Sequence, residues 1–107
     1  MGRRRRFTVY VARAVTTHGS VRFYVGCTEV LQGESQSTAV QRREQEHLSQ
    51  GFRVSAAWLR CAVSVQCRAE GPVLASSADG YWSEIVTTVQ LMAEFSRWCV
   101  RGGPTRW

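Results

Sequence analysis

The chain opens with a pattern of apolar and polar positions that predicts a β-hairpin. Residues 7–15 alternate in character, as in a strand with one buried face. The polar, glycine-containing stretch 16–20 predicts a turn, with His18 as a solvated loop residue, and residues 21–26 return as a second strand. The hairpin is antiparallel and places Tyr10 and Tyr24 on neighbouring strands.

A polar loop at 31–37 precedes a helix that we expect from about Thr38 to Gln50. Ser35 or Ser37 can cap its start, and Gly51 is a natural stop. Its apolar stripe is thin and consists of Ala39, Val40 and Leu48. Arg43 and His47 are four residues apart and therefore share one face of this helix.

The second half of the chain predicts a strand and a longer helix. Residues 52–58 look irregular, residues 59–67 alternate as a third strand, and Glu70-Gly71-Pro72 ends it before a short extended piece at 73–75. Residues 76–80 form a turn, and a helix follows from about Tyr81 to Trp98. Its apolar residues recur at helical spacing and predict the core-facing stripe: Trp82, Ile85, Val86, Val89, Met92 and Ala93.

These elements predict a small α/β (α+β) domain of β-β-α-β-α order, with a three-stranded, mainly antiparallel sheet flanked by helices. We expect a basic disordered tail at 1–6, one domain at 7–103 and a short tail at 104–107. The first tail could be a nuclear address, a nucleic-acid arm or a solvated end. With no apolar run near the roughly 20 residues that cross a bilayer, we expect a soluble intracellular protein, in the nucleus or an organelle if the tail directs it there.

Composition adds a preference for a polyanionic partner. The net charge is +6 and the calculated pI is about 9.9. All basic residues other than His are Arg, and Lys and Asn are absent, so part of the Arg excess reflects a GC-rich coding bias. The four cysteines show no C-x-x-C pair; we expect buried free thiols, with a structural metal as the alternative.

The tyrosines, the Arg-His pair and a Glu resemble the GIY-YIG nuclease domain, found in homing endonucleases, excision-repair nucleases and some restriction enzymes. Val9-Tyr10-Val11 keeps the Tyr of the first motif but lacks its Gly, and Tyr24-Val25-Gly26 matches the second. Arg43 with His47, and Glu84 at the start of a helix after the third strand, match the remaining motifs. The resemblance covers nearly the whole chain.

A subset of these domains has a further signature that is similar to this chain. The matching residues are Trp58, then Glu84, Thr88 and Met92 at spacings of four, and then Val100-Arg101-Gly102-Gly103. Two positions depart from it: Cys27 stands where many members have Lys, and Cys99 where the subset often has Asn.

The resemblance implies an endonuclease that nicks DNA with one Mg²⁺ or Mn²⁺ ion held by Glu84. Arg43 would contact the phosphate, Tyr10 would act as or position the general base, and Tyr24 would orient the water or phosphate. The metal, Arg43 or His47 would lower the pKa of Tyr10 or relay the proton. Nucleic-acid contacts are expected at Gly26, Arg42 and Arg101. We expect no small-molecule cofactor and a monomer or weak dimer. The alternatives are a catalytically decayed nucleic-acid-binding module of the same fold, and a basic interaction domain with no nucleic-acid role.

Overall fold

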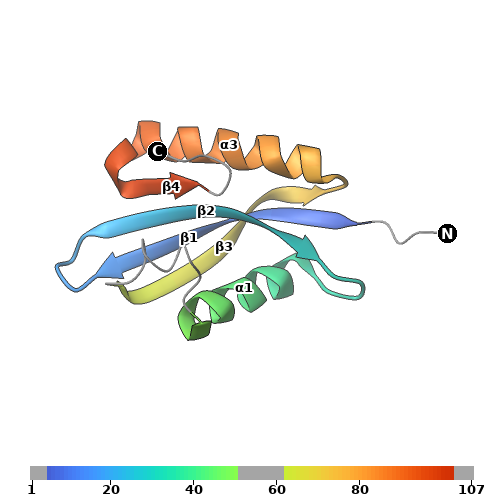
Figure 1. Ribbon diagram of the computed structural model, residues 1–107, viewed down its shortest axis with the longest axis horizontal. Helices are drawn as coiled ribbons and strands as arrows, with labels where there is room; N and C mark the ends of the chain where they lie inside the picture. Colours follow the sequence, from blue (N-terminus) through green and yellow to red (C-terminus); the bar gives the residue numbers. More distant parts are fainter. Residues whose placement is uncertain (1–4, 51–61, 103–107) are drawn as a thin grey trace.

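The computed structural model describes residues 5–50 and 62–102, with only the backbone at 47–50 and 62. It is a mixed α+β domain, as predicted, in which α1 and α3 lie on opposite sides of one sheet (Figure 1). In chain order the elements are β1 Arg6–Thr16, β2 Val21–Val30, α1 Gln36–Gln50, β3 Ala62–Leu74, α3 Ser77–Glu94, a 3₁₀ helix Arg97–Cys99 and β4 Val100–Gly102.

The sheet has four strands in the order β3-β1-β2-β4, so the expected three-stranded sheet is one strand too few. The hairpin of β1 and β2 is confirmed, with Tyr10 opposite Gly26. The added strand β4 pairs parallel to β2, and its Val100 is completely buried. A three-residue strand is too short to show an alternating pattern, which is why the sequence did not reveal it.

Strand β3 does not end at Glu70-Gly71-Pro72, contrary to the prediction. Phe7 of β1 pairs with Leu74 and Val9 pairs with Glu70, so the intervening residues of β3 bulge outward. Gly71 has φ of 74°, a value that glycine adopts without strain. Pro72 is tolerated because β3 is an edge strand, where a missing N–H breaks no ladder. The residues predicted to begin this strand, 59–61, lie outside the described part.

Helix α1 begins two residues earlier than expected. The Ser35 hydroxyl accepts a hydrogen bond from the Thr38 N–H at 3.2 Å, as a helix cap does. Gln36, in the first turn, donates from Nε2 to the Thr8 hydroxyl at 3.0 Å and to the Gly71 carbonyl at 2.8 Å. This side chain therefore fixes the start of α1 against β1 and the bulge of β3.

Helix α3 begins at Ser77, so the turn predicted at 76–80 is wrong. Ser76 is the cap, and its hydroxyl accepts from the Asp79 N–H at 3.1 Å. Gly80 lies within the helix and is buried. A Cβ atom at this position would be only 2.9 Å from the Cys27 Sγ of β2. The helix thus approaches the sheet closely at this point. It ends at Glu94 rather than at Trp98.

The predicted core-facing stripe of α3 is also wrong. The buried residues of α3 are Gly80, Glu84 and Thr88, at spacings of four, whereas the predicted stripe faces largely outward. Trp82 and Val86 are 64% and 51% exposed. Thr88 satisfies its buried hydroxyl by donating to the Glu84 carbonyl at 2.7 Å. Gly80 and Thr88 have small side chains, which lets the helix lie close to the strands on either side of Glu84.

Two apolar clusters occupy the two sides of the sheet. The cluster on the α3 side is built on Val9, Val11, Phe23, Val25 and Val100, with Leu91 and Met92 of α3 packed against it. The cluster on the α1 side is built on Tyr10, Ala12 and Val40. The alternation of β1 is thus used on both faces, and its even-numbered residues, including Tyr10, belong to the α1 side.

We expect the effect of Gly80→Ala on the free energy of unfolding to depend on the side chain at position 27. Replacing a helical Gly by Ala ordinarily stabilises by about 1 kcal/mol, but here the added methyl group meets the Cys27 sulfur. The gain should be absent in the wild-type background and should appear in Cys27→Ala. Urea unfolding of the four proteins of this double-mutant cycle measures the difference. Equal effects of Gly80→Ala in both backgrounds would show that the close contact is not made.

Candidate active site

Tyr10, Tyr24 and Arg43 lie on the same side of the sheet. In the β1–β2 register Tyr10 is opposite Gly26 and Ala12 is opposite Tyr24, and residues directly opposite share a face. Helix α1 covers this face and carries Arg43, whose Nη2 donates to the Tyr10 hydroxyl at 3.4 Å. The guanidinium carbon is 5.9 Å from the centre of the Tyr10 ring. The fold thus brings together three of the predicted site residues.

Tyr10 is only 1% exposed, which limits the chemistry of its hydroxyl. Burial raises the pKa of Tyr10 well above its usual range, although the nearby Arg43 opposes the effect. The phenol therefore stays protonated at neutral pH. Of the two predicted roles, general base or positioning group, this environment favours positioning.

Gly26 makes room for the Tyr10 ring. A Cβ atom at position 26 would overlap the Tyr10 hydroxyl and the ring carbon that bears it. The glycine of the Tyr24-Val25-Gly26 motif thus has a packing reason, since only a residue without a side chain lets the phenol lie across β2. The predicted nucleic-acid contact of Gly26 stays a prediction.

Tyr24 is half-buried, and charges of opposite sign act on its pKa. Burial raises the pKa of Tyr24, the negative charge of Glu84 raises it further, and the positive charge of Arg43 lowers it. Tyr24 is therefore within electrostatic reach of residues from both helices. Across the outer edge of β2 it pairs with Arg101 of β4, which is also half-buried. Arg43 shares the sheet face of Tyr24, whereas Glu84 belongs to α3, which lies on the other side of the sheet from α1.

Glu84 lies in the second turn of α3 and is 7% exposed. Its charge acts on Tyr24 and also on Cys27, whose pKa is raised to about 11 by burial and then by Glu84. A carboxylate is a suitable ligand for Mg²⁺ or Mn²⁺, whereas the protonated Cys27 thiol is not. Among the described residues no group of three or more His, Cys, Asp and Glu side chains gathers as a metal cluster. The metal-binding role of Glu84 therefore stays a prediction.

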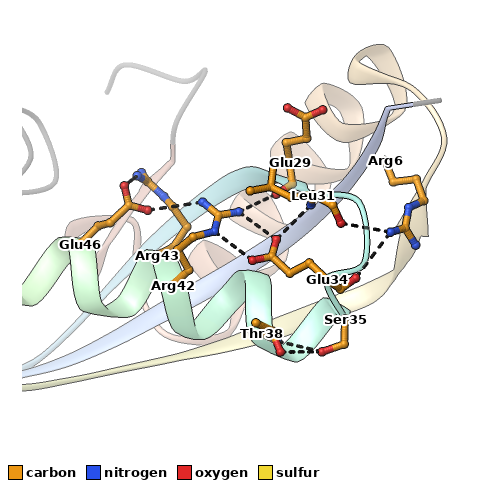
Figure 2. A network of polar contacts seen from close by, with 9 residues as sticks. All are labelled: Arg6, Glu29, Leu31, Glu34, Ser35, Thr38, Arg42, Arg43 and Glu46. Atoms are coloured by element: carbon orange, nitrogen blue, oxygen red, sulfur yellow. Dashed lines mark hydrogen bonds and ion pairs between the residues drawn. The ribbon is translucent and has the colours of Figure 1, made fainter. Parts of the chain in front are cut away.

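Arg42, predicted to contact nucleic acid, is held by acidic residues of the chain itself. Its Nε and Nη2 donate to the two carboxylate oxygens of Glu34 at 3.1 Å each, and Nη2 also donates to the Glu29 carbonyl at 2.9 Å (Figure 2). Glu34 also accepts from the Leu31 N–H at 3.0 Å, and its pKa is lowered chiefly by the hydrogen bonds from Arg42. This residue thus ties α1 to the 31–35 loop, and its role in nucleic-acid binding stays a prediction.

A second carboxylate connects Arg42 to Arg43. Glu46 is 3.6 Å from Arg42 Nη1 and 3.4 Å from Arg43 Nη1 (Figure 2). The position of the Arg43 guanidinium is therefore set by Tyr10 on one side and by Glu46 on the other. His47 is in α1, four residues after Arg43, but its side chain lies outside the described part, as does the whole of Trp58.

Two residues that shape the site, Glu34 and Cys27, were not among the predicted site residues. Glu34 binds Arg42, and the charge of Glu84 acts on Cys27. Neither has a periodic signal, because each contact joins segments that are distant in sequence or separated by a loop. Arg6, which was predicted as the last residue of the basic tail, is the first residue of β1. Arg5 forms an ion pair with Glu29 at 3.2 Å.

The chain matches no protein-family model, no curated protein and no solved structure. Neither helix in the described ranges is long and apolar enough to cross a bilayer. The assignment of function therefore depends on the geometry of the site.

Gly26→Ala should destabilise the fold by about 1–3 kcal/mol, the usual cost of overpacking a core. The added methyl group would displace the Tyr10 phenol from its place across β2. Urea unfolding measures the cost. In a Tyr10→Val background the same substitution should cost much less, and an equal cost in both backgrounds would contradict the packing explanation.

Stability should fall as the pH rises above about 9. The pKa values of Cys27 and Cys67 are raised from 9.0 to about 11 and about 12, mainly by burial. Above pH 9 these thiols ionise in the unfolded chain but not in the folded chain, so the free energy of unfolding falls. Urea midpoints measured at rising pH should decline less steeply in Cys27→Ala/Cys67→Ala. Cys99→Ala is the matched control, and an unchanged decline in the double variant would contradict the shifts.

Proposed function

We propose that this protein is a divalent-metal-dependent endonuclease that hydrolyses DNA phosphodiester bonds. The observation that supports the proposal most is the position of Tyr24 within electrostatic reach of both Arg43 and Glu84. Phosphodiester cleavage needs a cation near the non-bridging oxygens and a carboxylate that can hold a metal ion. The resemblance to GIY-YIG nucleases, which rests on the same residues, points to the same chemistry.

Each residue would have a distinct role. Arg43 would bind the non-bridging oxygens, because its planar guanidinium can donate two parallel hydrogen bonds. Tyr24, which is more accessible than Tyr10, would orient the attacking water or the phosphate through its hydroxyl. Tyr10 would hold Arg43 in place. Glu84 would hold one Mg²⁺ or Mn²⁺ ion, which supplies Lewis-acid stabilisation of the developing charge.

DNA is the proposed substrate because of the charge and its placement. The chain has a net charge of +6, and Arg101 stands opposite Tyr24 in the β2–β4 register. An Arg beside the site would add affinity for the backbone without reading bases. We therefore expect weak sequence preference.

A second candidate is a nucleic-acid-binding module of the same fold without turnover. Two observations favour it: burial keeps the Tyr10 hydroxyl protonated, and the Cys27 thiol beside Glu84 has a pKa raised to about 11. Neither group can take a proton from water at neutral pH. Proton transfer would then depend on Tyr24, on His47 or on water alone.

A plasmid-nicking assay with Mg²⁺ tests the proposal. Glu84→Gln and Arg43→Gln should each lower the nicking rate by about 10²–10³, the usual effect of removing one electrostatic contributor. Glu94→Gln is the matched control, since Glu94 is an exposed carboxylate on the same helix. Circular dichroism should show that all variants are folded, and chelation of the metal should abolish nicking.

The outcomes separate the candidates. Nicking by Glu84→Gln at the wild-type rate would refute the site. DNA binding without cleavage by the wild type, measured by fluorescence anisotropy, would favour the binding module. Absence of both binding and cleavage would favour a basic interaction domain with no nucleic-acid role.

A further inference from the structure

The outward side of α3 carries an apolar stripe with no cover in the described part of the chain. Trp82, Val86 and Val89 are 64%, 51% and 50% exposed, and Ala93 is exposed as well. Tyr81 extends the stripe, with its ring 5.6 Å from that of Trp82 in an edge-to-face arrangement. Isolated exposed apolar residues are normal, but a contiguous row on one helix indicates an interaction surface.

The spacing along the stripe is that of a helix-pairing seam. Trp82, Val86, Val89 and Ala93 are separated by four, three and four residues, which is the alternation that places knobs on one helix opposite holes on another. This row lies on the opposite side of α3 from Gly80, Glu84 and Thr88, which contact the sheet. A partner helix could therefore pack on it without disturbing the domain.

We propose that the stripe pairs with the α3 stripe of a second copy of this chain, antiparallel and about a two-fold axis between Thr87 and Thr88. This register places the largest side chain opposite the smallest, Trp82 against the partner's Ala93. It also places Val86 against the partner's Val89. The stripe is self-complementary in size only in the antiparallel direction, because the parallel direction would set Trp82 against the partner's Trp82.

Charge also agrees with this direction. Asp79, in the first turn of α3, would lie near the partner's Arg97, just beyond the end of the helix. A parallel pair would set the acidic first turns side by side. Antiparallel helices also align their dipoles favourably. Glu94, the remaining exposed acidic residue of α3, is off the stripe and does not face its own copy across the axis.

The contact is small, so the dimer should be weak. One helical stripe contributes a few hundred Å² of apolar surface, less than the roughly 800 Å² per partner of a standard interface. The net charge of +6 per chain opposes association. We therefore expect a micromolar dissociation constant that falls as salt screens this repulsion, opposite to the salt dependence of DNA binding.

Sedimentation equilibrium of the full chain, without nucleic acid, tests the pairing. Trp82→Glu should raise the dimer dissociation constant by at least about tenfold, as expected when the largest apolar side chain of an interface is replaced by a charge. Gln90→Glu, an exposed position on α3 outside the stripe, should leave it unchanged. A wild type that stays monomeric up to about 1 mM, or a dimer that Trp82→Glu does not weaken, would overturn the proposal.

A size swap tests the register. Trp82→Ala and Ala93→Trp should each weaken the dimer, because one leaves a gap and the other sets two Trp side chains against each other. The double variant restores one large and one small residue in each pair and should recover most of the wild-type affinity. Unfolding midpoints check that each variant is folded, as expected for exposed positions. Failure of the double variant to recover affinity would overturn the antiparallel register.

Discussion

The close approach of α3 to β2 at Gly80 and Cys27 is the constraint on which most of the structure depends. Because Gly80 has no side chain, α3 lies close to the Cys27 side chain of β2, and the residues that follow at spacings of four, Glu84 and Thr88, also face the sheet. This contact fixes Glu84 against the sheet, where its negative charge raises the pKa of Tyr24. It also turns the most apolar side of the helix outward. The candidate metal ligand and the proposed dimer surface are thus two consequences of one packing choice.

The elements with strong periodic patterns could be predicted from the sequence. The β1–β2 hairpin alternates cleanly, and α1 has a serine cap and a polar outer face, so their positions were correct to within a few residues. The bulge at Gly71 and the strand β4 could not be predicted, since both depend on pairing with distant segments. The predicted orientation of α3 was wrong for another reason. An apolar stripe identifies the side of a helix that avoids water, but it does not say whether the same domain or a partner covers that side.

The part of the candidate site that depends on which face of a strand a residue occupies could be predicted from the sequence. Tyr10 and Tyr24 share a face because the hairpin register is set by alternation. The pairs of Glu46 with Arg42 and Arg43 follow from helical spacing. The contacts of Arg42 with Glu34 and of Arg43 with Tyr10 could not be predicted, because they depend on tertiary geometry. Arg42, which was predicted as a nucleic-acid contact, donates to Glu34 of the adjacent loop. Net charge alone therefore says little about which arginines meet a polyanion in this chain.

The environments of the two tyrosines differ in a way that bears on the chemistry. Tyr10 is enclosed by Arg43 and the glycine of β2, and burial suppresses its ionisation, so it serves the site best as a rigid support for the guanidinium. Tyr24 is closer to solvent and experiences opposing fields from Glu84 and Arg43. A bound cation would offset the field of the carboxylate, and the phenol would then ionise more easily. Under the proposed function, a cation held by Glu84 would therefore favour ionisation of the Tyr24 phenol, whereas the Tyr10 phenol would stay protonated.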